Sequence, residues 1–580
     1  LNDIIAKINT NSVIFGSVYG GGNLGKVNGK ITFTVEDSTI SNEIYGAGNK
    51  AQVGIIENND SVFLTLKNVK AKNIYGGANA ALTLGNVNID ITGGIISESI
   101  FGGANGENSI VQGDQTGESN PAKVKGNINL KLDSVNAKNI YGGGNLGYSE
   151  KSVNVNAKNI NISESIYGGA NASRVKENTY LYVSGGNISG SVYAGGNGVL
   201  AIVEGNTNLD IDNNANILNH VFGGGNAAQT GTMEKNNSTG TVNIAGANIQ
   251  KNVYGGANTS VLYGTAYVNI GKNKVTNNEL ISSDIIIGGT VFGGGEANAS
   301  GSEIYDFTFI SVTKGMEINI DGLNHNIFTI SGSIFGSGNA SSTKGFSYIN
   351  IFNYGTNNNV KRNVSIQRAS KVVIDNSFIL LSGAKDRTNE YSDVLFTLSR
   401  LDELVLKNSS SIYLETGANL LKKFTSLTAS DEKASVIIDN ETGVVTKNVN
   451  NRLYMKAGKN LNIATNENVT EYGNVSGMTF FGMFELDRNK NIITALYNDF
   501  ENNQSVSSGD LYYFTNGSYV LGKHLTNHNT NIDGFYSNYA KDGSLIEIKY
   551  IEPTPKDASF YMWAIGEVVA SYEITLSASK

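Results

Sequence analysis

The feature that most constrains this chain is a motif of one aromatic residue, small residues and, in ten of its eleven copies, a closing asparagine. Four of the ten intervals between successive copies are 26 residues, and the others are longer, up to 43. The basic unit is therefore 26 residues with insertions. A unit this short cannot bury an apolar face alone, whereas stacked units bury one continuous core. The aromatic residues of the eleven copies are Tyr19, Tyr45, Tyr75, Phe101, Tyr141, Tyr167, Tyr193, Phe222, Tyr254, Phe292 and Phe335.

The apolar residues within one unit predict strands. When the aromatic residue is counted as position 1, the apolar side chains of the first unit stand at positions 13, 15, 17, 22 and 26. Alternation over positions 13 to 17 is the period of a half-buried strand, and no part of the unit has helical spacing. We therefore predict an all-β fold, a parallel β-helix (β-solenoid) that rises about 4.8 Å with each coil. The apolar residues of the first unit are Ile31, Phe33, Val35, Ile40 and Ile44.

Proline and glycine usage agrees with such a fold. Pro121, Pro553 and Pro555 are the only prolines, as a continuous sheet requires, because proline cannot donate to a strand ladder. We expect the motif glycines to form tight corners with positive φ angles.

The asparagine at position 5 predicts a structural ladder. In stacked coils, identical amides at one corner can hydrogen-bond to one another along the axis. A phosphate cradle is the competing interpretation, but it needs a helix after the glycines and a Lys or Ser/Thr at fixed spacing. The residues of the predicted asparagine ladder are Asn23, Asn49, Asn79, Asn105, Asn145, Asn171, Asn197, Asn226, Asn258 and Asn339, with Glu296 as the exception.

Three regions are expected along the chain. Residues 1–345 carry the regular repeats, and residues 346–465 contain strand-like segments at intervals that suggest irregular coils of the same helix. Residues 466–580 hold the dipeptides Asn516-Gly517 and Asp542-Gly543 between β-rich runs. These are signals for two-residue hairpins, so the third region is predicted to be an antiparallel, aromatic-rich β module or cap.

The composition limits the function classes. The chain has 43 Lys plus Arg against 51 Asp plus Glu, a formal net charge of -8 and a pI near 5.3, which disfavours nucleic-acid binding. No run of about 18 apolar residues exists, so we expect no direct membrane insertion. The absence of cysteine excludes disulfides and thiol chemistry and suits an extracellular protein. Because the chain starts at Leu1 without an initiator methionine or a signal peptide, we expect it to be part of a longer protein.

Catalysis and metal binding find little support among the residues. A carbohydrate-active β-helix enzyme needs two convergent carboxylates or a calcium site beside a basic residue. The carboxylates of the repeats stand at mixed positions, and the pair Asp210 and Asp212 has no counterpart in other units. His524 and His528 lie close together but in a loop-like segment. We predict no catalytic residues, no metal and no cofactor, while a polysaccharide lyase or glycoside hydrolase is kept as the alternative.

Aromatic residues are the more informative binding candidates. Simple alternation from the inward position 26 places the motif aromatic outward, where a stripe of rings would bind sugars. A bend at the glycines would instead turn the rings into the core, and the four Phe among eleven copies favour this second interpretation. In the terminal module, a group of aromatic residues either lines a ligand surface or forms a β core. This group is Tyr512, Tyr513, Tyr519, Tyr536, Tyr539 and Trp563.

Coils of the form [IV]-[YF]-G-[GA]-[GA]-N resemble the β-helical stalks of large cell-surface adhesins from Gram-positive bacteria, often clostridial. The resemblance covers residues 1–345 and extends further by continuity, and segments from Asn474 and Met562 are similar to parts of such proteins. It implies an extracellular protein attached to the cell wall through segments outside this chain. A host protein or a glycan is then the expected partner, in adhesion and virulence.

Insertions are where we expect specific binding, if the chain is an adhesin, because a regular column is uniform and surface loops vary at little cost. The alternative is that they are tolerated insertions without a role. The longest insertions give loops around 107–125, 272–284 and 300–326. A purely structural surface fibre or tailspike-like protein is the further alternative to an adhesin. The sequence predicts neither the ligand nor the oligomeric state.

Overall fold

The structure is a computed structural model. It describes residues 2–381 apart from 55–59, 107–121, 272–274, 277–278, 281–282, 297–308, 324, 326 and 356–361, and beyond 381 only the strands between Glu403 and Val568. The described residues form 53 β-strands and no helix. They divide into two units. Unit 1 comprises Leu1–Asn319, Asn324–Gly332 and Ser337–Phe346, and unit 2 comprises Ile320–Leu323, Ser333–Gly336 and Ser347–Lys580.

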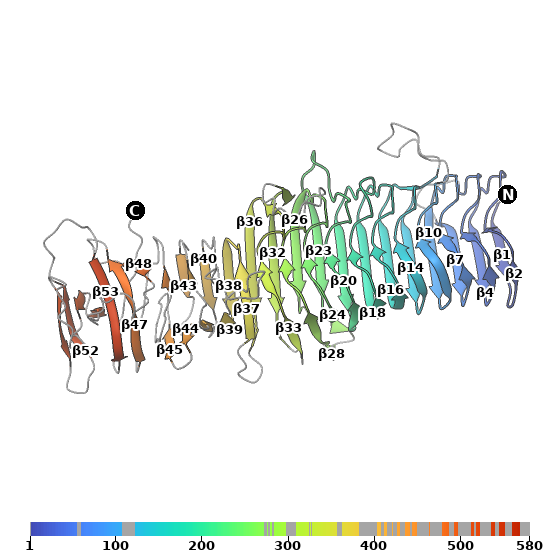
Figure 1. The fold of residues 1–580 in the computed structure, drawn as a ribbon. Helices are drawn as coiled ribbons and strands as arrows, with labels where there is room; N and C mark the ends of the chain where they lie inside the picture. Colours follow the sequence, from blue (N-terminus) through green and yellow to red (C-terminus); the bar gives the residue numbers. More distant parts are fainter. Residues whose placement is uncertain are drawn as a thin grey trace. The chain divides into compact units, whose positions relative to one another are not determined.

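Unit 1 is a parallel β-helix whose coils follow one another along a single axis (Figure 1). The longest strand of each coil starts near position 13 and pairs in parallel and in register with its copies, so that Ile31 lies opposite Val62 and Phe33 opposite Leu64. These long strands form one wall. In order they are β1 (Ile4–Ile8), β4 (Ile31–Glu36), β7 (Asp60–Lys67), β10 (Asn86–Thr92), β13 (Ile128–Asp133), β16 (Val153–Ile162), β18 (Thr179–Ile188), β20 (Thr207–Asp212), β23 (Ser238–Ile244) and β26 (Gly264–Ile270).

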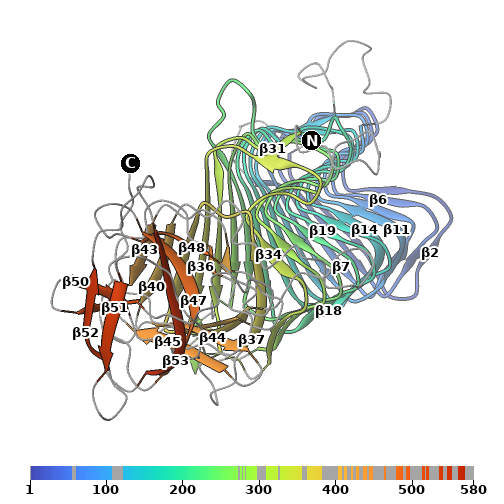
Figure 2. The same cartoon turned by 60° about the vertical axis from the view of Figure 1, so that its left-hand side comes forward.

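Two further walls consist of shorter strands, and the coil bends between them (Figure 2). Some strands, such as β11 (Ile95–Phe101), serve both of these walls. The second wall includes β2 (Val13–Ile14), β5 (Thr39–Ile40), β8 (Lys70–Ala71), β11, β14 (Asn136–Tyr141), β21 (Ala215–Ile217), β24 (Ala247–Ile249) and β29 (Ile285–Ile287). The third wall carries the motif aromatics on β3 (Val18–Tyr19), β6 (Glu43–Tyr45), β9 (Asn73–Tyr75), β11, β14, β17 (Ile166–Tyr167), β19 (Val192–Tyr193), β22 (Val221–Phe222), β25 (Val253–Tyr254) and β30 (Val291–Phe292).

The core of unit 1 lies between these walls. Side chains of the long strands alternate between buried and partly exposed, as in β4, and equal positions of successive coils stack on one another. Ile31, Val87 and Val153, which the sequence places in one column, are all completely buried. The predicted fold class, an all-β parallel β-helix, is therefore confirmed.

The motif glycines have a different role from the expected one. None of the glycines directly after the motif aromatics has a positive φ. A Cβ atom on Gly20 would lie 2.3 Å from the carbonyl oxygen of Gly46, and one on Gly142 would lie 2.3 Å from that of Gly168. These glycines are needed because adjacent coils approach so closely. The left-handed corner instead follows the long strand, at residues such as Asn68 with φ 50°.

Unit 2 combines parallel and antiparallel strands. Parallel pairs join β37 (Arg362–Gln367), β39 (Phe378–Leu381), β41 (Ser411–Leu414) and β44 (Ser435–Asn440), and also β38 (Lys371–Asp375), β40 (Glu403–Lys407) and β43 (Ser426–Ala429). Antiparallel pairs join β47 (Met478–Leu486) to β48 (Ile492–Leu496) and β53 (Phe560–Val568), β49 (Tyr512–Thr515) to β50 (Ser518–Leu521), and β51 (Phe535–Tyr539) to β52 (Leu545–Tyr550). Two residues separate β49 from β50, as the predicted hairpin requires.

Candidate functional site

The motif aromatics form a buried column in unit 1. From Tyr19 to Phe292, consecutive ring centroids are 4.7–4.9 Å apart and the ring planes are within 8° of parallel. Every ring from Tyr45 to Phe292 is at most 7% exposed. Burial raises the pKa of the hydroxyl of Tyr75 and of its copies. The rings are therefore turned inward, as the four Phe among the copies favoured, and the alternative of an exposed sugar-binding stripe is excluded for these rings.

The position-5 asparagines lie beside this column and bond to one another. Asn49 Nδ2 donates to Asn23 Oδ1 at 2.8 Å, and the same bond repeats coil by coil as far as Asn258, at 2.8–3.0 Å. The tyrosine hydroxyls join this network: Tyr141 bonds to the side chain of Asn197, two coils further on. The ladder and the column therefore stabilise one corner of every coil.

Glu296 interrupts the asparagine ladder. Its carboxylate accepts a hydrogen bond from the hydroxyl of Tyr254, and burial raises the pKa of Glu296. An ionised carboxylate has no hydrogen to donate to Asn258, the preceding member of the ladder. Glu296 is thus a weak point in an otherwise regular corner.

A second column of side chains accepts backbone hydrogen bonds two residues before most of the motif aromatics. Ser191 N donates to Ser165 Oγ at 3.1 Å, and Asn252 N donates to His220 Nδ1 at 3.2 Å. The His220 ring also contacts Phe222 and Tyr254. Burial, and then the charge of Lys251, lowers the pKa of His220 to about 4. His220 is therefore a neutral acceptor in a structural column.

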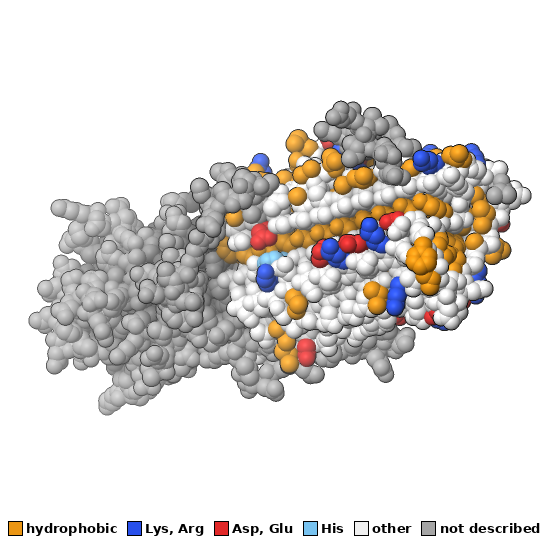
Figure 3. All heavy atoms as spheres, turned by 45° about the vertical axis from the view of Figure 1, so that its right-hand side comes forward, with side chains coloured by type: hydrophobic (Ala, Val, Ile, Leu, Met, Phe, Trp, Pro, Cys, Tyr) orange, Lys and Arg blue, Asp and Glu red, His pale blue; other side chains and the backbone are white. Residues whose placement is uncertain are grey.

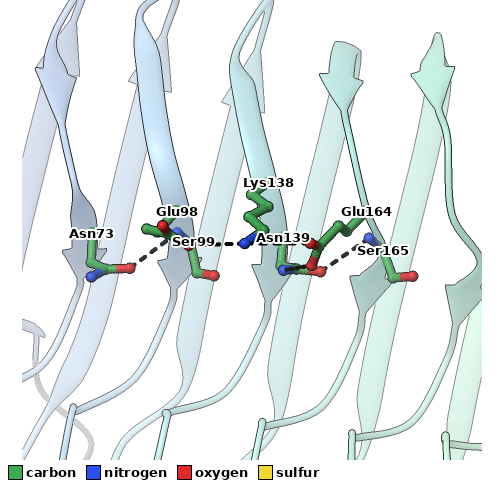
Figure 4. A network of polar contacts seen from close by, with 7 residues as sticks. All are labelled: Asn73, Glu98, Ser99, Lys138, Asn139, Glu164 and Ser165. Atoms are coloured by element: carbon green, nitrogen blue, oxygen red, sulfur yellow. Dashed lines mark hydrogen bonds and ion pairs between the residues drawn. The ribbon is translucent and has the colours of Figure 1, made fainter.

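Charged side chains on the outer surface of unit 1 pair with one another. Figure 3 shows acidic and basic side chains following one another along unit 1, and Figure 4 shows one such group. Lys138 Nζ lies 3.3 Å from Glu98 Oε2 and 3.4 Å from Glu164 Oε1, and Asn139 Nδ2 donates to Glu164 Oε2 at 2.6 Å. Hydrogen bonds with Glu98 and Glu164 raise the pKa of Lys138. Exposed pairs of this kind contribute little stability each, so we interpret the group as a solvated face.

A hollow of about 490 Å³ lies on the outward face of the long strands β7, β10, β13, β16, β18 and β20, and we call it the amide groove. The outward side chains of these strands line it in two rows along the stacking axis. The first row is Phe63, Asn88, Asn129, Asn154, Tyr180 and Asn208, and the second is Thr65, Asp90, Lys131, Asn156, Tyr182 and Asp210. Inward neighbours such as Leu130 form its floor.

Aromatic rings stand at both ends of the amides in this groove. Phe63 and Tyr180 are separated by four strand spacings, roughly 19 Å. Tyr180 is 43% exposed, and the hydroxyl of Tyr182 donates to both oxygens of Asp212, at 2.9 and 2.8 Å. Between Phe63 and Tyr180, the amides of the row bond to one another. Asn129 Nδ2 donates to Asn88 Oδ1 and Asn154 Nδ2 donates to Asn129 Oδ1, each at 2.9 Å. The groove thus combines fixed amides with large apolar rings.

The charges of the amide groove are already bonded. Lys131 Nζ lies 3.1 Å from Asp90 Oδ2, and Asp210 Oδ1 accepts a hydrogen bond from Asn243 at 2.7 Å. In contrast, Asn156 Oδ1 is buried and has no hydrogen-bond partner among the described residues. A groove of this kind suits a neutral ligand that supplies hydroxyl donors.

The predicted binding residues of the terminal module cannot be placed as side chains. Tyr512, Tyr513, Tyr519, Tyr536, Tyr539 and Trp563 lie on described strands, but their side chains are outside the described part of the chain. The loop predicted around 300–326 is wrong over its second half, which contains the strands β31 (Ile310–Val312) and β32 (Gly315–Asp321). The described part also leaves out residues 107–121, parts of 272–284, His524 and His528. The predictions for these residues therefore stay predictions.

Sequence reasoning missed the amide groove. A signal was present, because Asn88, Asn129 and Asn154 occupy the same outward position in three consecutive units. The aromatic ends were hidden, since Phe63 and Tyr180 alternate with core residues as any strand residue does.

No family model matches this chain, and neither a curated protein nor a solved structure gives a significant match. Within the described residues, no group of three or more His, Cys, Asp or Glu could hold a metal ion. A search of the same residues finds no helix long and apolar enough to cross a membrane.

Proposed function

We propose that this chain is the binding stalk of a bacterial surface adhesin, displayed outside a Gram-positive cell and attached through other segments. The amide groove is the observation that carries this proposal, because it places aromatic rings and amides on a regular scaffold. Sites for small ligands are typically hollows of 300–1,000 Å³ with a few placed polar groups, and the groove has about 490 Å³. In this proposal the solenoid holds the groove away from the cell and presents it to a host glycan or matrix.

The carboxylates of the groove favour binding over catalysis. Asp90 and Asp210 stand in one row four strand spacings apart, roughly 19 Å. Glycoside hydrolases place their two carboxylates about 5 to 9.5 Å apart. The two groove carboxylates are therefore too distant from each other to act on one glycosidic bond.

A glycoside hydrolase is kept as the second candidate because of Asp210 and Asp212. These residues are two apart on β20, a separation of about 7 Å, which is within the range for an inverting enzyme. Asp212, however, accepts two bonds from Tyr182, and Asp210 accepts one from Asn243. Both carboxylates are thus already engaged in hydrogen bonds with side chains of neighbouring strands.

Beads coated with the full chain test the proposal. They should adhere to epithelial cells or to surfaces coated with mucin or plant and animal polysaccharides, and the same protein should release no new reducing ends from these polysaccharides. Beads coated with heat-unfolded protein are the control. Release of reducing ends that is abolished in Asp210→Asn would favour the hydrolase, and failure of the beads to adhere to every surface would contradict the adhesin.

A further inference from the structure

We infer that the amide groove binds a neutral, extended polysaccharide of β-1,4-linked sugars, whose chain lies along the stacking axis. This inference rests on the proposed binding function and names its ligand class.

The shape favours a straight chain. The two rows of the groove run from coil to coil at one strand spacing, and the register is constant from β10 to β20. A β-1,4-linked sugar chain is also straight, and each sugar advances it by roughly one strand spacing of about 4.8 Å. A helical chain, such as an α-1,4-linked glucan, would leave the groove after a few sugars.

The charge favours a neutral chain. The lining contains two carboxylates, Asp90 and Asp210, and one cation, Lys131, so it carries a net charge of -1. Lys131 is bonded to Asp90 at 3.1 Å and is therefore not free to pair with a ligand carboxylate or sulfate. A polyanion would be repelled, whereas a neutral sugar chain would not be affected.

The hydrogen-bonding groups favour hydroxyls. Asn129 and Asn154 each use one amide hydrogen within the row, so a second hydrogen of each amide is left for a ligand oxygen. Asn156 Oδ1 is buried and has no partner in the described part of the chain, which costs free energy that a ligand hydroxyl would recover after the side chain rotates. Hydroxyl groups both donate and accept, so a sugar can satisfy both kinds of group.

The aromatic rings provide stacking surfaces at the ends. Tyr180 is 43% exposed although it belongs to a strand whose inward neighbours are buried. Phe63 lies roughly 19 Å away along the same row, a distance that several sugars span. The apolar faces of sugar rings can pack on both aromatic rings while the hydroxyls at their edges reach the amides between.

Calorimetric titration of the full chain with cellohexaose tests the inference. Cellohexaose should bind, whereas maltohexaose, which is neutral but helical, and a hexamer of galacturonic acid, which is anionic, should bind at least tenfold more weakly. Tyr180→Ala and Phe63→Ala should each weaken cellohexaose binding by roughly tenfold, as expected for the loss of an aromatic contact. Tyr267→Ala is the matched control, because Tyr267 stands in the same outward row on β26 but outside the groove.

The outcomes test the ligand class and the adhesin function separately. Absence of cellohexaose binding at millimolar concentration, or tighter binding of the galacturonic acid hexamer, overturns the inference even if coated beads adhere. Equal binding by Tyr180→Ala and the native chain also overturns it, provided that circular dichroism shows the variant folded. Conversely, beads that fail to adhere although cellohexaose binds in the groove contradict the adhesin and leave the ligand class supported.

Discussion

Single buried side chains decide how well each coil fits its neighbours. In one inward column of unit 1, valines of successive coils bridge in parallel, and Thr83, Ser149 and Thr230 interrupt them. The hydroxyl oxygens of these three residues are buried and have no partner among the described residues. A buried hydroxyl without a hydrogen bond destabilises the folded state, so such residues are expected to respond to apolar replacement.

Thr230→Val should stabilise the protein. Thr230 is completely buried between Val203 and Leu262, and valine keeps its shape while removing the unpaired hydroxyl. We expect a gain of about 1 kcal/mol in the free energy of unfolding, measured by chemical denaturation. Thr179→Val is the matched control, because Thr179 is equally buried but its Oγ1 donates to Ala194 O at 2.7 Å, so that variant should lose stability. Equal effects of the two variants would refute this account.

His220 makes the native chain sensitive to acid. Its pKa is lowered to about 4 in the folded state, so the stability that it contributes is complete above its unfolded value of about 6.5 and is lost as the pH falls towards 4. Protonation would also remove the acceptor that Nδ1 offers to Asn252 N.

His220→Asn should therefore flatten the pH dependence of stability between pH 6.5 and 4. Asparagine already serves as the acceptor in this column at Asn139, which accepts from Ser165 N, so the variant should keep its stability at pH 7. Thermal unfolding across this pH range measures the difference, with the native chain expected to lose about 1–2 kcal/mol more after allowance for the partial exposure of His220. An unchanged pH profile would show that His220 does not titrate as described.

At the scale of the element, every corner and wall is a column of like residues. The asparagine ladder bonds amide to amide, the aromatic column stacks ring on ring, and the long strands pair in register. The repeated contact of a column is interrupted only where the repeated residue changes. Glu296, which stands where the other ten units have asparagine, is such a change in the tenth unit.

Glu296→Asn should stabilise the protein at neutral pH. Its pKa is raised in the folded state, so the native chain is favoured below the unfolded pKa and loses stability as the pH rises through the folded one. Asparagine removes this penalty and supplies an amide hydrogen for Asn258. The gain should be about 1 kcal/mol at pH 7 and should disappear in acid, as denaturation at both pH values would reveal.

Asn171→Ala is the companion variant within the ladder. It removes the donor to Asn145 and the acceptor for Asn197, and should cost about 1 to 3 kcal/mol. If Glu296→Asn failed to stabilise while Asn171→Ala destabilised, the ladder would matter but its break at Glu296 would not.

The sequence predicted the elements better than the site. Alternation at positions 13 to 17 placed Ile31 and its copies in the core, because inward positions repeat in every coil. Alternation alone placed the motif aromatics outward, and it failed because the coil bends at glycines whose Cα atoms face the next coil's carbonyl oxygens. The amide groove depends on which outward residues become neighbours after insertions of different length. Phe63, Asn129 and Tyr180 therefore stand in one row only in the register of the folded wall.

At the scale of the whole molecule, we propose that the amide groove is the surface with which this chain binds. Unit 1 offers a second hollow of about 360 Å³ on another wall, lined by an amide row that includes Asn136, Asn161 and Asn187 but by no aromatic ring. The two hollows therefore provide a natural comparison. Asn129 and Asn161 are both interior members of an amide row, each donating to the preceding coil and accepting from the next.

The most direct measurement uses single cysteines, which the chain lacks altogether. Asn129→Cys and Asn161→Cys are each labelled with a maleimide polyethylene glycol, and adhesion of protein-coated beads and cellohexaose affinity are compared before and after labelling. We predict that unlabelled Asn161→Cys binds normally, and that unlabelled Asn129→Cys binds a few-fold more weakly because it loses an amide that faces the ligand. Labelling at 129 should then reduce adhesion and affinity at least tenfold further, whereas labelling at 161 should change neither. Full binding after labelling at 129, or an equal loss from labelling at 161, would contradict this prediction.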